Sequence, residues 1–350
     1  MKHQTTRYGE IPFYKIGTFG NTADAFISKK LFLEYKTKYS FPKKGDILIS
    51  ASGTIGRAVI YDGKPAYFQD SNIVWIDNDE TLVKNDFLFY AYSHVKWNTE
   101  HTTILRLYND NFRNTLIPLP PLNEQSAIAD ILSALDRYLH ALDSLILKKE
   151  SVKKALSFEL LSQRKRLKGF NQAWQRVRLG DICEIVKGQQ INKISLNNTD
   201  KYPVINGGID FLGYTNKFNV SKNTIAISEG GTCGYVRFMT SNFWSGGHNY
   251  SLQKISNKVN NLCLYHILKS YEKDIMKLGV GSGLKNIQLK ALKDFEILLP
   301  PLNEQIAIAN ILSALDNEIT SLKNKKRQFE NIKKALNHDL MSAKIRVLEK

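Results

Sequence analysis

Two stretches of the chain carry apolar residues at every third or fourth position, which is the spacing of one face of an α-helix. Each stretch covers about 40 residues and follows a Pro-Pro pair, Pro120-Pro121 or Pro300-Pro301, which cannot lie inside a helix. A stripe of this length predicts a helix of roughly 60 Å, and two such helices with matching stripes predict an antiparallel coiled coil. The apolar positions are Ile128, Leu132, Leu135, Leu139, Leu142, Ile146, Val152, Leu156 and Leu160 in the first stretch and Ile308, Leu312, Leu315, Ile319, Leu322, Phe329, Ile332, Leu336 and Leu340 in the second.

These two stretches are copies of one segment. Residues 120–136 and 300–316 are identical at fifteen of seventeen positions, at a constant offset of 180. The same offset relates 153–156 (KKAL) to 333–336. The chain is therefore a duplicated half-protein, for which we expect a pseudo-twofold axis.

The regions that precede the helices, 1–119 and 174–299, alternate apolar and polar residues in short runs bounded by turn residues, which is typical of strands. Both contain a Gly-Thr-x-Gly sequence, at 53–56 and at 231–234, but around it they share little. The predicted fold class is thus α+β, with two mixed α/β domains joined by two long helices packed as an antiparallel coiled coil. The predicted domains are 1–119 and 174–299, the predicted helices are 120–169 and 300–350, and the charged segment 164–173 separates the two repeats.

Composition adds a partner class. The 350 residues contain 49 Lys and Arg against 33 Asp and Glu, a formal net charge of +16. Such an excess favours binding to a polyanion such as nucleic acid, although it also serves solubility alone. No apolar run approaches the ~18 residues of a membrane span, and the N-terminus lacks a signal-peptide core. Cys183, Cys233 and Cys263 are too widely spaced to indicate a disulfide framework, so we expect a cytoplasmic protein.

Four segments together resemble the specificity subunit of type I restriction-modification systems. Pro118–Gln125 (PLPPLNEQ) and Leu299–Gln305 (LPPLNEQ) precede the helices. Trp174–Asp181 (WQRVRLGD) opens the second globular region, and Gly45–Gly56 contains GDILIS followed by GTIG. The resemblance covers nearly the whole chain.

The resemblance implies a non-catalytic subunit that binds double-stranded DNA. Each globular region would be a target-recognition domain that reads one half of a bipartite sequence, and the helices would set the spacing between the halves. Two methyltransferase subunits with S-adenosylmethionine would methylate adenine, and restriction subunits would supply ATP- and Mg²⁺-dependent translocation and cleavage. No cofactor is expected on this chain. For Asn123, Glu124, Gln125, Asn303, Glu304 and Gln305 we expect a methyltransferase-docking or structural role rather than catalysis.

Candidate DNA contacts are polar residues in and around the Gly-Thr-x-Gly segments and in the loops ahead of the Pro-Pro pairs. Loops of this kind cradle phosphates or enter the major groove, although the same residues also form ordinary turns. The candidates are Ser52, Thr54, Arg57, Gln69, Ser71, Asn72, Thr103 and Arg106 in the first domain and Thr232, Arg237, His248, Asn249, Ser282, Lys285 and Asn286 in the second.

The first domain departs from the pattern of the second. In the second domain about 28 residues (174–201) precede Tyr202-Pro203-Val204. In the first domain only ten precede the matching Ile11-Pro12-Phe13, so the Trp and Leu-Gly-Asp opening has no counterpart there. We expect either that the true start lies upstream or that the gene is rearranged within its first recognition domain.

Two other functions remain open at this point. One is a coiled-coil adaptor without DNA specificity. The other is a metal-dependent nuclease, because Asp46 and Asp62-Gly63-Lys64 imitate a D…DxK metal site, although Asp62-Gly63 also forms a typical hairpin turn.

Overall fold

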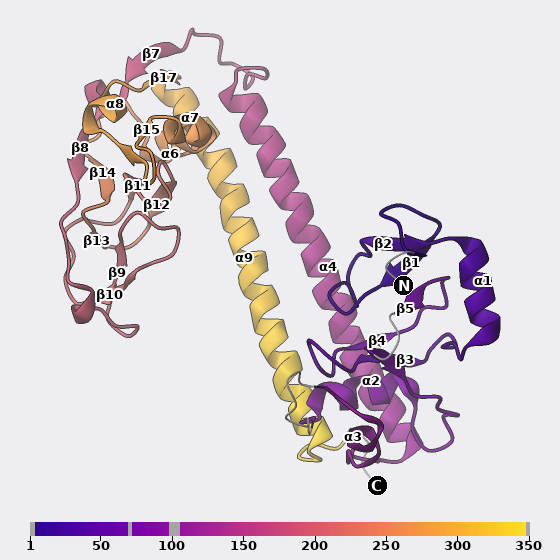
Figure 1. Cartoon of the computed structure of the whole chain (residues 1–350). Coiled ribbons are helices and arrows are strands. Elements are labelled where there is room, and N and C mark those ends of the chain that lie inside the picture. The colour runs from indigo at the N-terminus through magenta and orange to yellow at the C-terminus, as the bar shows by residue number, and fades with distance from the viewer. Residues whose placement is uncertain (1–3, 69–71, 98–105, 348–350) are drawn as a thin grey trace. The chain divides into compact units, whose positions relative to one another are not determined.

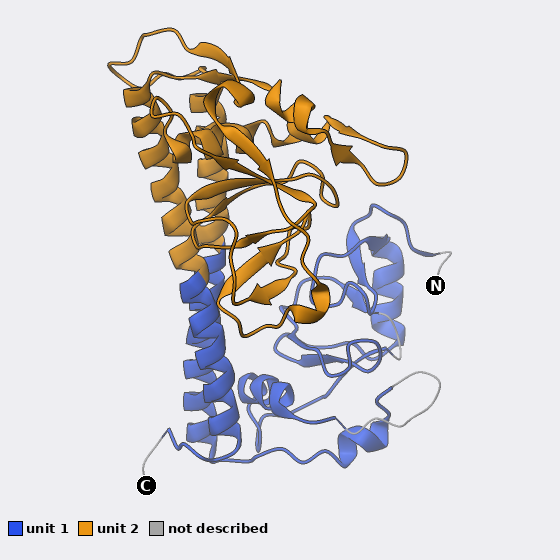
Figure 2. Ribbon diagram, turned by 90° about the vertical axis from the view of Figure 1, so that its left-hand side faces the viewer, with its two compact units in different colours: residues 1–143, 324–350 blue, residues 144–323 orange. Residues whose placement is uncertain are grey.

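The computed structural model describes residues 4–68, 72–97 and 106–347 of the chain. They form two compact units, one of residues 1–143 and 324–350 and the other of residues 144–323. Two 40-residue helices, α4 (Leu122–Leu161) and α9 (Leu302–Met341), are each divided between the units (Figures 1 and 2). Each unit therefore contains one globular domain, one half of α4 and one half of α9.

Within each unit the two half-helices run antiparallel and are joined by ion pairs. In unit 1, Lys333 pairs with Asp136 and Lys326 with Asp143, so one helix ascends as the other descends. In unit 2, Lys153 pairs with Asp316, and Lys149 with Glu318. Lys153 is the repeat equivalent of Lys333, and Asp316 is that of Asp136, so the same ion pair occurs once in each unit. The predicted antiparallel pairing and internal repeat are confirmed.

The domain of unit 1 contains two three-stranded sheets and three short helices. One sheet has the order β2-β1-β5 and the other the order β4-β3-β6, with β1 and β5 parallel and the remaining pairs antiparallel. The core is divided among several small clusters, of which one joins Phe87 and Ala91 to Ile128 and Leu132 of α4. The elements are β1 (Ile11–Tyr14), β2 (Ala25–Ile27), α1 (Lys29–Lys38), β3 (Ile47–Ser50), β4 (Ala58–Ile60), β5 (Tyr67–Phe68), β6 (Ile73–Trp75), α2 (Asn85–His94) and α3 (Asn109–Arg113).

The domain of unit 2 repeats this arrangement with additional elements. The sheet β10-β9-β13 corresponds to β2-β1-β5, and β12-β11-β14 corresponds to β4-β3-β6 but is extended by β8. A large core cluster connects β11, β14 and α6 to Ile308 and Leu312 of α9, and a smaller one lies around Phe243. The elements are β7 (Gln175–Arg178), α5 (Leu179–Ile182), β8 (Glu184–Lys187), η2 (Lys193–Ser195), β9 (Tyr202–Ile205), β10 (Gly213–Thr215), β11 (Thr224–Ser228), β12 (Val236–Met239), β13 (Trp244–Ser245), β14 (Asn249–Gln253), α6 (Asn261–Ser270), α7 (Glu272–Met276), β15 (Gly279–Val280), β16 (Asn286–Ile287), α8 (Leu289–Lys293) and β17 (Glu296–Leu299).

The long helices are shorter at both ends than predicted, and their apolar stripe is only partly buried. Each begins two residues after its predicted start, because the Pro-Pro pair precedes it. Nine of the eighteen stripe residues, Leu132 and Leu312 among them, are buried and seven are half-buried, but Val152 and Ile332 are 46% and 50% exposed. These two residues are repeat equivalents, so the register leaves the same position uncovered in both halves. In the described residues no helix is long and apolar enough to cross a membrane.

The buried histidine of unit 2 provides a test of this packing. His266 lies on α6, is 4% exposed, and its Nε2 is 3.2 Å from the Ser313 hydroxyl of α9. Burial lowers the pKa of His266 to about 4. The unfolded imidazole, with its ordinary pKa near 6.5, therefore takes up a proton as pH falls from about 6.5 to about 4, while the folded one does not.

We expect the free energy of unfolding to fall by about 2 kcal/mol more between pH 7 and pH 4.5 in the native chain than in a His266→Gln variant. Denaturant unfolding at pH 7 and pH 4.5 measures the difference. Carboxylates elsewhere titrate equally in both proteins and cancel. Identical pH dependence in the two proteins would contradict the burial of this side chain.

Candidate nucleic-acid interface

The two Gly-Thr-x-Gly loops are built on the same backbone hydrogen bonds. In unit 1 the Gly56 amide donates to the Ser50 carbonyl at 2.9 Å, and in unit 2 the Gly234 amide donates to the Ser228 carbonyl at 2.8 Å. The strand after each loop also returns in the same register, since Ser50 and Ser228 each donate to the residue that follows the second glycine. The loops connect β3 to β4 and β11 to β12, at the ends of buried strands. Two unlike sequences thus form one loop framework.

Two further segments meet each loop in matching positions. Ala51 donates to the Asn72 carbonyl and accepts from the Leu107 amide, both at 2.8 Å. Glu229 likewise donates to the His248 carbonyl and accepts from the Ile287 amide, both at 2.9 Å. In each unit the residue two positions before the loop therefore bonds on one side to the residue ahead of β6 or β14. On the other side it bonds to the segment ahead of the Pro-Pro pair.

The glycines of this framework are required by its geometry. Gly56 and Gly234 have φ values of +79° and +84°, in the left-handed region that favours glycine. A Cβ at Gly234 would lie 2.8 Å from backbone atoms of Met276. The Gly-Thr-x-Gly pattern is thus explained by the turn itself, whatever else the loop contacts.

The described candidates of unit 1 lie around the loop, but several are engaged with one another. The Ser52 hydroxyl donates to Asn72 Oδ1 at 2.7 Å, and the Arg57 guanidinium donates to the Phe19 carbonyl at 2.9 Å. Arg106 forms a backbone bridge with Ser52 and its guanidinium lies over the Tyr108 ring. Thr54 is exposed at the loop tip. Gln69, Ser71 and Thr103 lie outside the described residues.

In unit 2 the candidates divide into exposed and internal groups. Ser282, Lys285 and Asn286 are exposed in one segment, and the Asn286 side chain lies against Gly230 of the loop. Thr232 is half-buried at the loop, where its amide donates to the Gly207 carbonyl. His248 is exposed on the neighbouring connection. These residues form what we call the unit 2 loop cluster: 206–209, 229–234, 246–248 and 281–286.

Two candidates of unit 2 are used inside the fold. Asn249 is 1% exposed, and its amide donates to the Ser245 hydroxyl and the Tyr250 carbonyl. The Arg237 guanidinium donates to the carbonyls of Gly208 and Ile209, both at 2.6 Å. Burial lowers the pKa of Arg237, with Tyr235 and Asp210 opposing the shift. Both side chains thus have hydrogen-bond partners within the domain.

Sequence reasoning missed the charged centre of the unit 2 loop cluster. Glu229 is 8% exposed, and its Oε1 accepts from Lys187 Nζ at 2.7 Å and from the Tyr250 hydroxyl at 3.2 Å. Its Oε2 has no hydrogen-bond partner among the described residues and lies 3.8 Å from His248 Nδ1. The available signal was the alignment of the repeats, which places Glu229 where the first domain has Ala51. The carboxylate in this position holds Lys187 at the edge of the loop and lies close to the His248 ring.

The glutamates of the Asn-Glu-Gln segments are buried and have partners within the chain. Glu304 forms a bidentate ion pair with Arg166 (Nε–Oε1 2.8 Å, Nη2–Oε2 2.7 Å), and Trp174 Nε1 donates to the same Oε2 at 3.0 Å. In unit 1, Glu124 makes the equivalent bidentate ion pair with Arg346 (Nε–Oε1 2.6 Å, Nη2–Oε2 2.5 Å). Hydrogen bonds from Arg346 lower the pKa of Glu124.

The glutamines attach the long helices to the domains. Gln125 Nε2 donates to the Leu82 and Pro120 carbonyls, and its Oε1 accepts from the Lys84 amide. Gln305 makes the same three contacts in unit 2, with Lys258, Pro300 and Asn260. Asn123 and Asn303 are exposed. The Glu and Gln side chains thus hold the structure together, and only the asparagines face outward.

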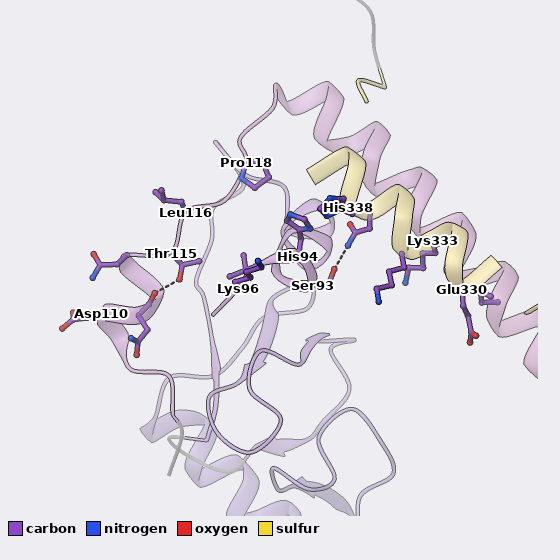
Figure 3. Close-up of a pocket in the computed structure, with 16 residues that line it drawn as sticks. Ser93, His94, Lys96, Asp110, Thr115, Leu116, Pro118, Glu330, Lys333 and His338 are labelled. Carbon is purple, nitrogen blue, oxygen red and sulfur yellow. Dashed lines mark hydrogen bonds between the residues drawn. The ribbon is translucent and has the colours of Figure 1, made fainter. Parts of the chain in front are cut away.

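Unit 1 also contains a cavity of about 1260 Å³, which lies apart from the Gly-Thr-x-Gly loop (Figure 3). It lies between the end of α2, the segment after α3 and the side of α9, where the His94 and His338 rings are 5.1 Å apart. Val95 and Thr115 line it at the positions that Tyr271 and Phe295 occupy in unit 2, where the two rings are in edge contact at 5.9 Å. Smaller side chains thus stand in unit 1 where two aromatic rings meet in unit 2.

The two aspartates of the D…DxK pattern accept hydrogen bonds from nearby backbone amides in turns. Asp46 is 5% exposed and accepts from the Lys43 amide at 2.7 Å, while Asp62 accepts from the Lys64 amide at 2.9 Å. Across residues 4–68, 72–97 and 106–347, no group of three His, Cys, Asp or Glu side chains is placed to hold a metal ion.

Known proteins match both repeats. A family model described as "Type I restriction modification DNA specificity domain" matches residues 1–149 and 171–331. A putative type I restriction enzyme MjaX specificity subunit of Methanocaldococcus jannaschii is 30% identical over 335 residues, covering 87% of this chain and 79% of that one. A putative type I restriction enzyme specificity subunit of Haemophilus influenzae is 63% identical over 137 residues, but the match spans only 39% of this chain and 36% of the relative. The crystal structure of a type I restriction-modification S subunit from M. genitalium matches with a TM-score of 0.71 at 20% identity, covering 97% of this chain and 91% of that one, and shows the same fold.

The loop framework yields a stability prediction. We expect Gly234→Ala to destabilise the chain by at least about 2 kcal/mol, because alanine is disfavoured at positive φ and its Cβ meets the Met276 backbone. Gly283→Ala is the control, since no atom lies within 4 Å of a Cβ there. Denaturant unfolding of both variants tests the difference. Equal stabilities would show that the loop does not take this conformation.

Proposed function

Because the chain belongs to the family of type I restriction-modification DNA specificity proteins, we propose that it reads a bipartite DNA sequence through two recognition domains. The observation that carries this proposal is the pair of Gly-Thr-x-Gly loops, which share one backbone framework and carry different side chains. A shared framework with different side chains suits two reading heads that approach DNA alike but prefer different bases.

The chemistry of the unit 2 loop cluster agrees with a DNA ligand. Lys187, Lys285 and His248 place cationic or hydrogen-bonding groups around one loop, beside the exposed amide of Asn286. Lysine contributes phosphate contacts, while amides and imidazoles can read base edges. The net charge of +16 supplies the wider attraction to the phosphate backbone.

We propose that methylation and restriction are performed by partner subunits in the cytoplasm. On this view S-adenosylmethionine, ATP and Mg²⁺ bind those partners, and the chain itself is not an enzyme. The long helices would then fix the distance between the two half-sites and carry the docking surfaces for two methyltransferase subunits.

One docking surface is suggested by the helix pair of unit 1. An open apolar groove of about 480 Å³ lies between α4 and α9 and includes Leu135, Tyr138, Phe329 and Ile332. The repeat-equivalent positions of Tyr138 and Phe329 in unit 2 are Glu318 and Lys149, which form an ion pair at 2.7 Å. We infer that the two methyltransferase contacts are chemically different, one apolar and one charged.

The decisive experiment is genome-wide mapping of adenine methylation in cells that co-express the full chain with a cognate type I methyltransferase subunit. We expect a motif with two defined halves separated by a fixed gap. Methylation independent of sequence, or a chain that co-purifies with the methyltransferase without directing methylation, would refute the proposal.

Single substitutions in unit 2 should affect only one half of the motif. We expect His248→Ala to relax base preference at one position of that half by about 1–3 kcal/mol, and Lys285→Ala to weaken DNA binding uniformly and reduce the salt dependence by about one phosphate contact. Lys222→Ala is the matched control, because Lys222 is exposed at the opposite end of β11 from the loop. Equal effects of Lys222→Ala and Lys285→Ala would remove the loop cluster from the interface.

A further inference from the structure

Glu229 is a buried carboxylate whose two oxygens have different surroundings. The residue is 8% exposed, and its Oε1 accepts from Lys187 Nζ at 2.7 Å and from the Tyr250 hydroxyl at 3.2 Å. Its Oε2 is also buried but has no hydrogen-bond partner among the described residues. A buried carboxylate oxygen without a donor costs free energy, so a donor from a neighbouring side chain is strongly favoured there.

The loop does not need a carboxylate at this position to fold. Unit 1 has Ala51 at the equivalent point of the framework, where it makes the corresponding two backbone hydrogen bonds. Glu229 is therefore a charged residue that the framework tolerates without requiring it. An unsatisfied buried group of this kind calls for an explanation outside the backbone fold.

His248 is the side chain placed to supply the donor. Its Nδ1 lies 3.8 Å from Glu229 Oε2, which is too long for a hydrogen bond. The backbone of His248 is fixed, because its amide donates to Asn206 Oδ1 and its carbonyl accepts from the Glu229 amide, both at 2.9 Å. The side chain is 55% exposed, so rotation of the imidazole can close the gap without movement of the loop.

The charge of the Glu229 carboxylate is already balanced by another residue. Lys187 Nζ contacts Oε1 at 2.7 Å and supplies one positive charge. Burial and the Glu229 carboxylate raise the pKa of Tyr250 to about 12, so its hydroxyl remains a donor. A neutral imidazole with its proton on Nδ1 therefore satisfies Oε2 without a second positive charge. The other ring nitrogen of His248, Nε2, is then a hydrogen-bond acceptor.

Unit 1 also has a loop residue that contacts the side chain at this position. Asn72 is the equivalent of His248, and its Oδ1 accepts from the buried Ser52 hydroxyl at 2.7 Å. The loop of unit 1 thus engages an acceptor atom of Asn72, whereas Glu229 faces a ring nitrogen of His248. The side chain ahead of β6 or β14 is therefore contacted from the loop in both halves, by groups of opposite hydrogen-bonding character.

We propose that Glu229 is a positioning residue that sets how His248 reads DNA. Its Oε2 accepts from Nδ1–H of His248, and Nε2 accepts a hydrogen bond from the exocyclic amino group of a base in the major groove. That group is N6 of adenine or N4 of cytosine. A carboxylate fixes the tautomer of a histidine in the same way in metal sites. The inference rests on the proposed function, because it assigns a partner atom to the reading loop of unit 2.

Glu229→Gln reverses this arrangement with little change in shape. Lys187 and Tyr250 are both donors to Oε1, so the glutamine oxygen stays there and its NH₂ group takes the place of Oε2. That group donates to Nδ1 and moves the imidazole proton to Nε2, which becomes a donor. Glu184→Gln is the matched control, because Glu184 lies at the other end of β8, is ion-paired with Lys254 and has a side chain that is 51% exposed.

The tautomer is measured without DNA, by ¹⁵N NMR of the full chain labelled at histidine and held at mildly alkaline pH. His248→Ala assigns the ring signals. We expect a protonated Nδ1 and an unprotonated Nε2 in the native chain and in Glu184→Gln, and the reverse in Glu229→Gln. A proton on Nε2 in the native chain, or the same tautomer in Glu229→Gln, would overturn the proposal.

The base contact is measured with the full chain bound to a cognate type I methyltransferase subunit. His248→Ala identifies the base pair, because base preference relaxes there. Every base pair presents one amino group in the major groove, so that group is removed by replacing adenine with purine or cytosine with pyrimidin-2-one. We expect this replacement to raise Kd at least about tenfold for the native chain and Glu184→Gln, and less than about twofold for Glu229→Gln.

Equal losses in the native chain and in Glu229→Gln would contradict the inference, because His248 would then contact the base without help from Glu229. So would native binding that is indifferent to the amino group. Complexes that bind all duplexes alike would instead refute the proposed function, and the base contact with it. The NMR measurement needs no DNA, so it distinguishes that failure from a failure of Glu229 to position His248.

Discussion

The structure depends on a bidentate ion pair between a buried glutamate and an arginine, which occurs once in each half. Glu304, in the first turn of α9, binds Arg166, which follows the end of α4, and Glu124 of α4 binds Arg346 beyond the end of α9. Each contact therefore joins the start of one long helix to the end of the other, which sets an antiparallel register. A buried carboxylate without its arginine would be strongly destabilising, so the register is specified as well as stabilised. The neighbouring glutamines connect the same helix starts to the domains through three hydrogen bonds each.

The ion pairs along the helices complete this register. Five of the nine lysines on the two helices form pairs with a carboxylate of the opposite helix: Lys149, Lys153, Lys323, Lys326 and Lys333. Exposed ion pairs add little stability individually, but a slip of the helices would bring like charges together. The positive charge of these lysines is thus partly compensated within the chain.

The repeat made the fold predictable, and local geometry limited what could be predicted of the site. Matching apolar stripes after two Pro-Pro pairs were sufficient to predict the long helices, because periodicity and proline act within a few residues. The loops were located from Gly-Thr-x-Gly, but side-chain roles depended on distant partners. The Arg237 guanidinium, for example, is bound to the carbonyls of Gly208 and Ile209, which are more than 25 residues away in the sequence. Glu229 escaped notice because its significance comes from Lys187 and Tyr250, more than twenty residues away on both sides.

The same comparison explains how two halves with one origin can acquire different functions. Backbone hydrogen bonds of the loops do not involve side chains, so Ala51 and Glu229 occupy one framework position without altering it. Substitutions there change only what the loop presents. The helices have less freedom, because a side chain at their contact must match a partner that belongs to the other repeat. Where the copies differ there, they differ in pairs, as when Tyr138 and Phe329 stand in place of Glu318 and Lys149. Divergence is therefore tolerated in the domains and opposed in the helices, which is the distribution that two readers of different sequences on one spacer require.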